Sequence, residues 1–178
     1  MWPLRTMARA AVPMLLDDSL GLGGHPPHRQ AAAACEVMRL AEVTHRRPDW
    51  GIRSVHAQGR DWEVTEEEVH HAAFGTLRRF AKAGAPAQPR VLIVAPMSGH
   101  FATLLRDTVR TVLQDHDVYI TDWLNARDVP LSEGRFGLDE YIEHVMAFLA
   151  AIGPGAHLMA ICQPCVAALA ATALMSEN

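Results

Sequence analysis

The second half of the chain alternates apolar runs with segments of helical periodicity. Three continuous apolar runs predict strands that are covered on both faces: residues 91–95, 117–121 and 157–161. Apolar positions at steps of three and four predict a helix after each strand: residues 101–113, 138–152 and 164–175. Because short connections join each strand to its helix, this order predicts a parallel sheet with right-handed crossovers.

The first half has a different pattern. Residues 1–49 predict a peripheral arm, partly helical or flexible, with one helix over residues 29–45. Alternating polar and apolar positions at 52–57 and 62–65, separated by a turn at Gly59, predict an antiparallel hairpin. Residues 75–80 predict a third extended segment. We therefore expect one domain over residues 50–178, in which a hairpin precedes a mostly parallel sheet.

Composition narrows the function classes. The chain has 178 residues, of which 49% are hydrophobic, enough for a core of ordinary size. Sixteen Lys and Arg against twenty Asp and Glu give a net charge of −4 without a sustained basic run, so we expect no nucleic-acid partner. No stretch has the roughly 18 uninterrupted apolar residues of a membrane span. Three cysteines, an odd number, favour a reducing compartment, and we expect the cytoplasm.

The strongest chemical signal is Cys162, which lies between a predicted strand and a predicted helix. A sharp turn at this place, a nucleophile elbow, holds a side chain above the edge of the sheet. The positive end of the following helix favours a thiolate there. The backbone amide of Gln163 would then face the oxyanion of a tetrahedral intermediate. A buried structural cysteine is the competing interpretation, because most free cysteines are small buried hydrophobes.

The loop after the first of these strands predicts the second oxyanion donor, from the amide of Met97 or Ser98. Ser98 could equally cap the next helix, and His100 could be a base or a polar residue that opens this helix. After the second strand, Asp122 is expected to anchor a loop by hydrogen bonds.

Cys162 and Cys165 also form a C-x-x-C pair, which is typical of a redox dithiol or of half a zinc site. Zinc needs two more ligands, and the third cysteine, Cys35, lies far away in the arm. We therefore expect no metal and no cofactor, and a redox pair stays open as an alternative.

Four segments, taken together and in order, point to a known family: VLIVAPMSGHFATLLR at 91–106, DHDVYITDW at 115–123, VPLSEGRF at 129–136 and ICQP at 161–164. They resemble the intracellular polyhydroxyalkanoate depolymerases, the poly(3-hydroxybutyrate) depolymerases that mobilise bacterial storage polymer. The resemblance covers about residues 49–174.

The resemblance implies an α/β-hydrolase-like fold that uses Cys where most relatives use Ser. It implies Cys162 as the nucleophile, an acyl-enzyme intermediate, and hydrolysis of ester bonds in a polyester. The implied partners are this polyester or the surface of a storage granule, in the cytoplasm.

The resemblance also implies a truncation. In α/β-hydrolases the triad acid and His follow the nucleophile, whereas this chain ends 16 residues after Cys162. We expect an N-terminal half, truncated before the last strands and inactive alone.

Two other classes stay open. One is a polyester synthase or thioesterase of the same fold. Synthases typically have a Gly-x-Cys-x-Gly elbow, however, and Ala160 and Pro164 depart from it. The other is a non-catalytic granule-binding remnant, whose exposed sheet edge would favour self-association.

Overall fold

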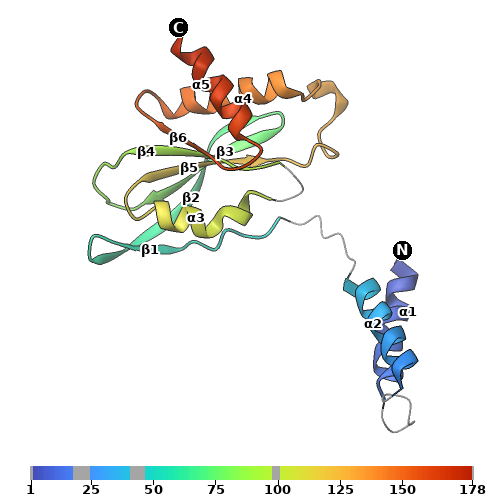
Figure 1. Cartoon of the computed structure of the whole chain (residues 1–178). Coiled ribbons are helices and arrows are strands. Elements are labelled where there is room, and N and C mark those ends of the chain that lie inside the picture. The colour runs from blue at the N-terminus through green and yellow to red at the C-terminus, as the bar shows by residue number, and fades with distance from the viewer. Residues whose placement is uncertain (1, 18–24, 41–46, 98–100, 178) are drawn as a thin grey trace. The chain divides into compact units, whose positions relative to one another are not determined.

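The computed structural model describes residues 2–17, 25–40, 47–97 and 101–177. The chain forms two compact units, residues 1–46 and residues 47–178. In the first unit, helices α1 (Trp2–Leu15) and α2 (Pro26–Leu40) pack against each other (Figure 1). Ala8 and Ala32 are buried there. The second helix was expected over residues 29–45; it begins earlier, at Pro26, and residues 41–46 lie outside the described part.

The second unit contains a mixed sheet and its covering helices. Its strands are β1 (Ser54–Ala57), β2 (Arg60–Ala72), β3 (Gly75–Lys82), β4 (Arg90–Val94), β5 (Asp117–Trp123) and β6 (His157–Ala160). Its helices are η2 (Ala102–Leu105), α3 (Arg106–Val112), η3 (Leu131–Glu133), α4 (Leu138–Ile152) and α5 (Cys165–Ser176). The expected helix over residues 138–152 has the observed bounds.

The six strands form one sheet in the order β1-β2-β3-β5-β4-β6. Neighbours are antiparallel from β1 through β3 to β5, and only the pairs β5–β4 and β4–β6 are parallel. The predicted mostly parallel, α/β-hydrolase-like sheet is therefore wrong. The expected hairpin over residues 52–65 is present as β1 and β2, but it is one part of a larger antiparallel half.

The length of β2 explains this error. Residues 66–68 are all glutamates and do not alternate, so the sequence pattern ends the strand at residue 65. In the structure Glu67 lies opposite Arg79 and Glu68 opposite Arg78 of β3, and Glu66, opposite Phe80, pairs with Arg78 through its side chain. Opposite charges on neighbouring strands stabilise such a ladder. The strand therefore continues to Ala72, and the long β2–β3 hairpin makes the sheet mostly antiparallel.

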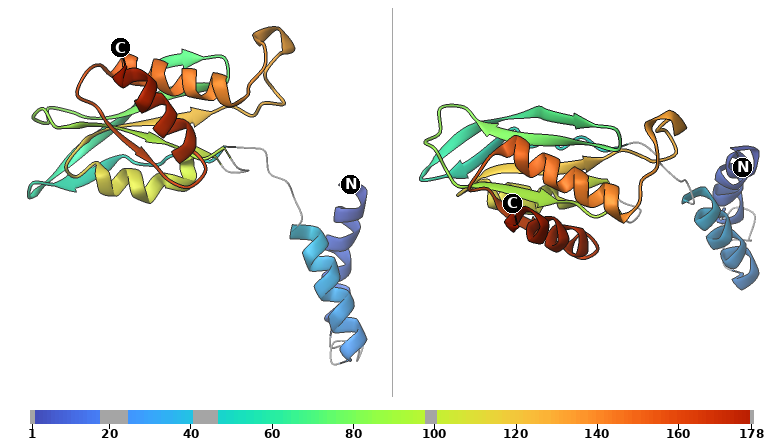
Figure 2. Two further views of the ribbon diagram at one scale, coloured as in Figure 1. Left: turned by 45° about the horizontal axis from the view of Figure 1, so that its top comes forward. Right: turned by 90° about the horizontal axis from the view of Figure 1, so that it is seen from above.

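Helices cover both faces of this sheet (Figures 1 and 2). On one face, Val109 of α3 and Leu113, the residue directly after α3, pack with Ile93 of β4 and Phe80 of β3. On the other face, α4 and α5 cover a second core that includes Leu92, Val94, Val145, Phe148 and Ala171. The central strands are thus buried on both sides, as their continuous apolar sequence predicts.

None of the helices described here is long and apolar enough to cross a membrane.

Candidate functional site

The ends of three strands meet at one edge of the sheet. Because β4 lies between β5 and β6 and is parallel to both, the residues that follow these strands lie next to each other. Hydrogen bonds join the first two ends. The amide of Ala95 donates to Oγ1 of Thr121 over 2.9 Å, and Nε1 of Trp123 donates to the carbonyl of Ala95 over 2.8 Å. The parallel part of the sheet therefore places the residues that follow β4, β5 and β6, the three expected segments, next to each other.

Cys162 lies in the turn between β6 and α5, with a backbone φ of +70°. Residues other than glycine rarely adopt this left-handed backbone conformation, which costs about 1–3 kcal/mol and recurs at functional sites. The turn is closed by the amide of Cys165, which donates to the carbonyl of Cys162 over 3.1 Å. Cys162 is a free, exposed thiol, so it is not the buried structural cysteine of the competing interpretation.

Gln163 connects this turn to the end of β4. Its side-chain Oε1 accepts a hydrogen bond from the amide of Met97 over 3.4 Å, a long and therefore weak bond. The structure thus brings together Met97 and Gln163, two of the three expected oxyanion donors. The third, Ser98, lies outside the described residues, as does His100. Within the described part of the chain, the amide of Gln163 donates no hydrogen bond.

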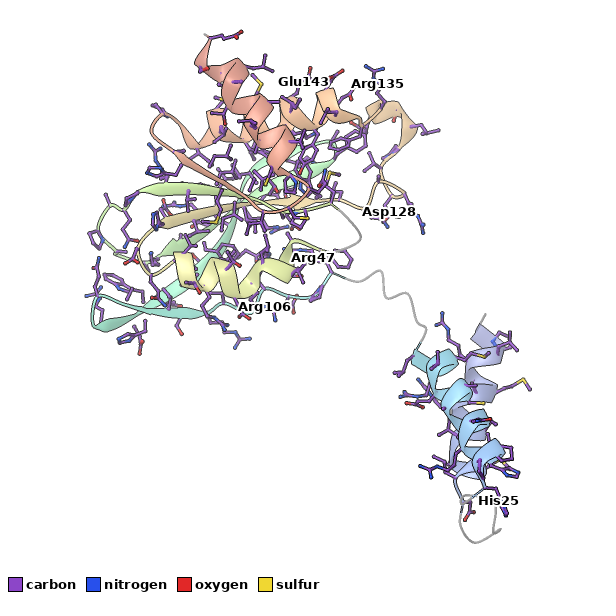
Figure 3. All side chains as sticks on the ribbon, viewed as in Figure 1. His25, Arg47, Arg106, Asp128, Arg135 and Glu143 are labelled. Carbon is purple, nitrogen blue, oxygen red and sulfur yellow. The ribbon has the colours of Figure 1, made fainter. Side chains whose placement is uncertain are left out.

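Asp122, which was expected to anchor a loop, belongs to β5 and pairs with Arg78 of β3 and with Arg47 of the irregular segment before β1. Its carboxylate is 5% exposed, and Oδ2 lies 2.6 Å from Nε of Arg78 and 2.8 Å from a guanidinium nitrogen of Arg47. Both arginines also pair with Glu66 on β2. Arg47 lies two residues before Asp49, whose carbonyl accepts a hydrogen bond from Arg106 of α3 (Figure 3). This network holds Asp122 in place.

The last residue of β5, Trp123, opens an aromatic cluster under α4. Its ring lies 4.9 Å from the ring of Tyr141 and 6.0 Å from that of Phe148, between centroids. Burial raises the pKa of Tyr141 well above its usual range, and the electrostatic interaction with Cys165 adds to the rise. The Tyr141 hydroxyl is buried and has no hydrogen-bond partner among the described residues. Tyr141 therefore lies between the end of β5 and the start of α5.

An open groove of about 900 Å³ lies between α4, β6 and α5. Its lining is largely apolar and includes Leu149, Leu158, Ala160, Cys165 and Leu169. Cys162 does not line the groove, but Cys165, three residues later, stands at its margin. No sequence pattern indicates this groove, because it arises where β6 forms the outer edge of the described sheet.

The arginines around Asp122 also escaped the sequence analysis. Arg78 reaches Asp122 from a strand that is 44 positions away in sequence, so only the register between β3 and β5 reveals the contact. Tyr141 did carry a signal, since it lies on the apolar face of the predicted helix. Its electrostatic interaction with Cys165 could not be predicted from the sequence, because it joins α4 to α5.

Among the residues that the structure describes, no three His, Cys, Asp or Glu side chains form a group that could hold a metal ion. Comparisons of the chain with protein-family models, curated proteins and solved structures found no match.

Proposed function

We propose that Cys162 is the nucleophile of a carboxylic ester hydrolysis and forms the acyl-enzyme. The observation that carries the proposal is the conformation of Cys162, an exposed thiol at positive φ in a turn between a parallel strand and a helix. Strain of this kind persists where the surrounding structure imposes it, and it is characteristic of nucleophile turns. The helix α5 begins three residues later, and its positive end favours a thiolate.

The reaction takes two steps. The Cys162 sulfur attacks the ester carbonyl carbon, a carbon–sulfur bond forms, and the alcohol end of the substrate leaves with a proton. Water then splits the thioester, which releases the acid and restores the thiol. In both steps a negative oxygen forms, and backbone amides stabilise it best when they point at it in advance.

The hydrogen bond between Gln163 and Met97 describes the two backbone amides before a substrate is bound. The Gln163 amide is unpaired among the described residues, and the Met97 amide is held by the weak bond to the Gln163 side chain. An oxyanion is a stronger acceptor than a neutral amide oxygen. It would therefore take the Met97 amide from Gln163 during the reaction.

The surroundings favour an apolar substrate. Ile161, Val166 and Leu169 are exposed around the turn, and Leu169 is exposed to 74%. The groove beside Cys165 continues this apolar surface. Together with the resemblance to intracellular polyhydroxyalkanoate depolymerases, this supports a polyester substrate, met in the cytoplasm at the surface of storage granules. A second copy could also associate through β6, which pairs only with β4 in the described sheet.

The test is the acylation of Cys162 by p-nitrophenyl butyrate, followed by intact mass and peptide fragmentation. We expect one acyl group per chain, on Cys162, removed by hydroxylamine. Cys162→Ala should abolish this adduct, and the matched variant Cys35→Ala, in the helical unit, should keep it. Equal acylation of all three cysteines would contradict the proposal. Release of 3-hydroxybutyrate from amorphous polyhydroxybutyrate then tests the substrate class.

A further inference from the structure

The turn that presents Cys162 holds a second exposed thiol, that of Cys165. The hydrogen bond from the Cys165 amide to the Cys162 carbonyl, 3.1 Å long, joins residues three apart. A turn closed by such a bond keeps its end Cα atoms within about 7 Å. A disulfide needs Cα atoms about 4.4–6.8 Å apart. The backbone therefore already holds the two cysteines near the spacing of a disulfide.

The direction of the Cys165 thiol supports the same conclusion. Its Sγ lies 3.3 Å from the carbonyl oxygen of Ala160, to which it donates a weak hydrogen bond. Ala160 is the last residue of β6, directly before the turn. The thiol of Cys165 thus points back across the turn rather than along α5, and a rotation of its side chain releases only this weak bond.

We propose that Cys162 and Cys165 form a peroxide-sensitive dithiol that reversibly switches off the nucleophile. First, the Cys162 thiolate attacks one oxygen of hydrogen peroxide, the O–O bond breaks, and hydroxide leaves to become water, which makes a sulfenic acid. The Cys165 sulfur then attacks the Cys162 sulfur, a disulfide forms, and the second oxygen leaves as water. In total, two thiols lose two protons and two electrons, and one peroxide becomes two waters.

The two thiols have different tasks in this scheme. Cys162, in the strained turn before α5, reacts with peroxide, and Cys165 resolves the sulfenic acid. Resolution prevents further oxidation to sulfinic acid, which is irreversible in most proteins. Attack by an external dithiol restores both thiols. The loss of activity rests on the proposed function, whereas the formation of the disulfide does not.

The sequence allows a direct test on the whole chain. No Lys or Arg follows Arg135, so one tryptic peptide, 136–178, contains both cysteines, and Cys35 lies alone in peptide 30–39 as an internal control. The reduced protein is treated with equimolar hydrogen peroxide, alkylated with iodoacetamide and digested. We expect peptide 136–178 to lose two hydrogens, to take up no alkyl group and to recover with dithiothreitol. Cys35 should stay alkylatable and react at least about tenfold more slowly.

Two variants assign the roles. Cys165→Ser should accumulate a sulfenic acid on Cys162 that dimedone traps, and Cys162→Ser should leave Cys165 alkylatable. Three results would overturn the proposal: two alkylated thiols in peptide 136–178 after peroxide, equal dimedone labelling of wild type and Cys165→Ser, or equally fast disulfide formation in the urea-unfolded chain. The last result would show that the folded turn contributes nothing.

The acylation assay separates this proposal from the proposed function. If both hold, the oxidised protein should resist p-nitrophenyl butyrate and regain its acylation with dithiothreitol. A disulfide without specific acylation of Cys162 would refute the ester chemistry alone. Specific acylation that survives peroxide would refute the switch alone.

Discussion

The ends of β5 and β6 lie at the same edge of one sheet, but they hold their functional groups in opposite ways. At the end of β5, the Asp122 carboxylate is buried and paired with Arg78 and Arg47. Beyond the end of β6, the Cys162 thiol is exposed and makes no side-chain hydrogen bond within the described residues. A carboxylate that is paired in this way is poorly placed to react, whereas an unpaired exposed thiol is free to do so.

The difference follows from the free-energy cost of removing each group from water. A buried carboxylate needs partners that replace its water, and Oδ2 of Asp122 pairs with two arginines, while Oδ1 has no hydrogen-bond partner among the described residues. A thiol needs little solvation, and the strain at the turn lies in the backbone instead. The ion pairs at the end of β5 therefore stabilise the fold, whereas the strained turn that exposes Cys162 after β6 destabilises it. Each of the following changes tests one side of this comparison.

The largest effect is expected for Asp122→Asn. The neutral amide would leave Arg78 and Arg47 without their buried counter-charge, although both arginines are partly exposed and Glu66 still pairs with them. We expect the free energy of unfolding in urea to fall by about 2–3 kcal/mol.

The matched control is Asp61→Asn, which removes the exposed pair with His56. Exposed pairs contribute little, so this change should cost less than about 0.5 kcal/mol. Similar losses for both variants would show that the end of β5 is not stabilised by its buried ion pairs.

A second test is Gly75→Ala, at the position opposite Trp123. A Cβ at Gly75 would lie 2.8 Å from Cε3 of Trp123, inside contact distance. The ring cannot move freely, because it packs on Tyr141 and donates to Ala95. We expect a loss of about 2 kcal/mol in the free energy of unfolding.

The Trp123→Phe background provides the control for this test. The smaller ring leaves room for the added methyl group, so Gly75→Ala should cost clearly less there. An equal cost in both backgrounds would contradict a clash with the indole.

Sequence patterns predicted the parts of the fold that depend on local periodicity. The helix over residues 138–152 and the buried strand after Arg90 follow from apolar spacing alone, and the structure confirms both. The sheet as a whole was predicted wrongly, because its type depends on pairing. Glu66, Glu67 and Glu68 break the alternation, and their ion pairs with arginines of β3 explain why the strand continues.

The site divides in the same way. Cys162 was recognisable as a candidate because a strand, a turn and a helix follow each other within a few residues. The partners of Asp122, the groove beside Cys165 and the bond between Met97 and Gln163 join distant segments. No pattern within one segment contains that information.

Tyr141→Phe tests the buried hydroxyl of the ring that packs on the end of β5. The Tyr141 hydroxyl is buried without a partner among the described residues, so its removal should raise the free energy of unfolding at neutral pH by about 1 kcal/mol. Burial, together with the electrostatic interaction with Cys165, raises the pKa of Tyr141 in the folded protein. Above pH 10, the unfolded chain therefore releases a proton that the folded chain keeps, and stability falls as the pH rises.

Urea unfolding between pH 8 and pH 11 measures both effects. Tyr141→Phe should reduce the alkaline loss but not abolish it, because burial also raises the pKa of Tyr119. The same pH dependence in wild type and variant would show that Tyr141 does not keep its proton through burial.

The smallest effect is expected at Cys162 itself, from a comparison of Cys162→Gly with Cys162→Ala. Both variants remove the thiol, but only glycine adopts the φ of +70° without strain. Relief of this strain is partly offset by the greater freedom of glycine in the unfolded chain, so Cys162→Gly should be more stable than Cys162→Ala by about 0.5 kcal/mol. Paired urea titrations resolve the difference. If alanine were the more stable variant, the turn would not store strain, and the contrast between a relaxed β5 end and a strained β6 end would fail.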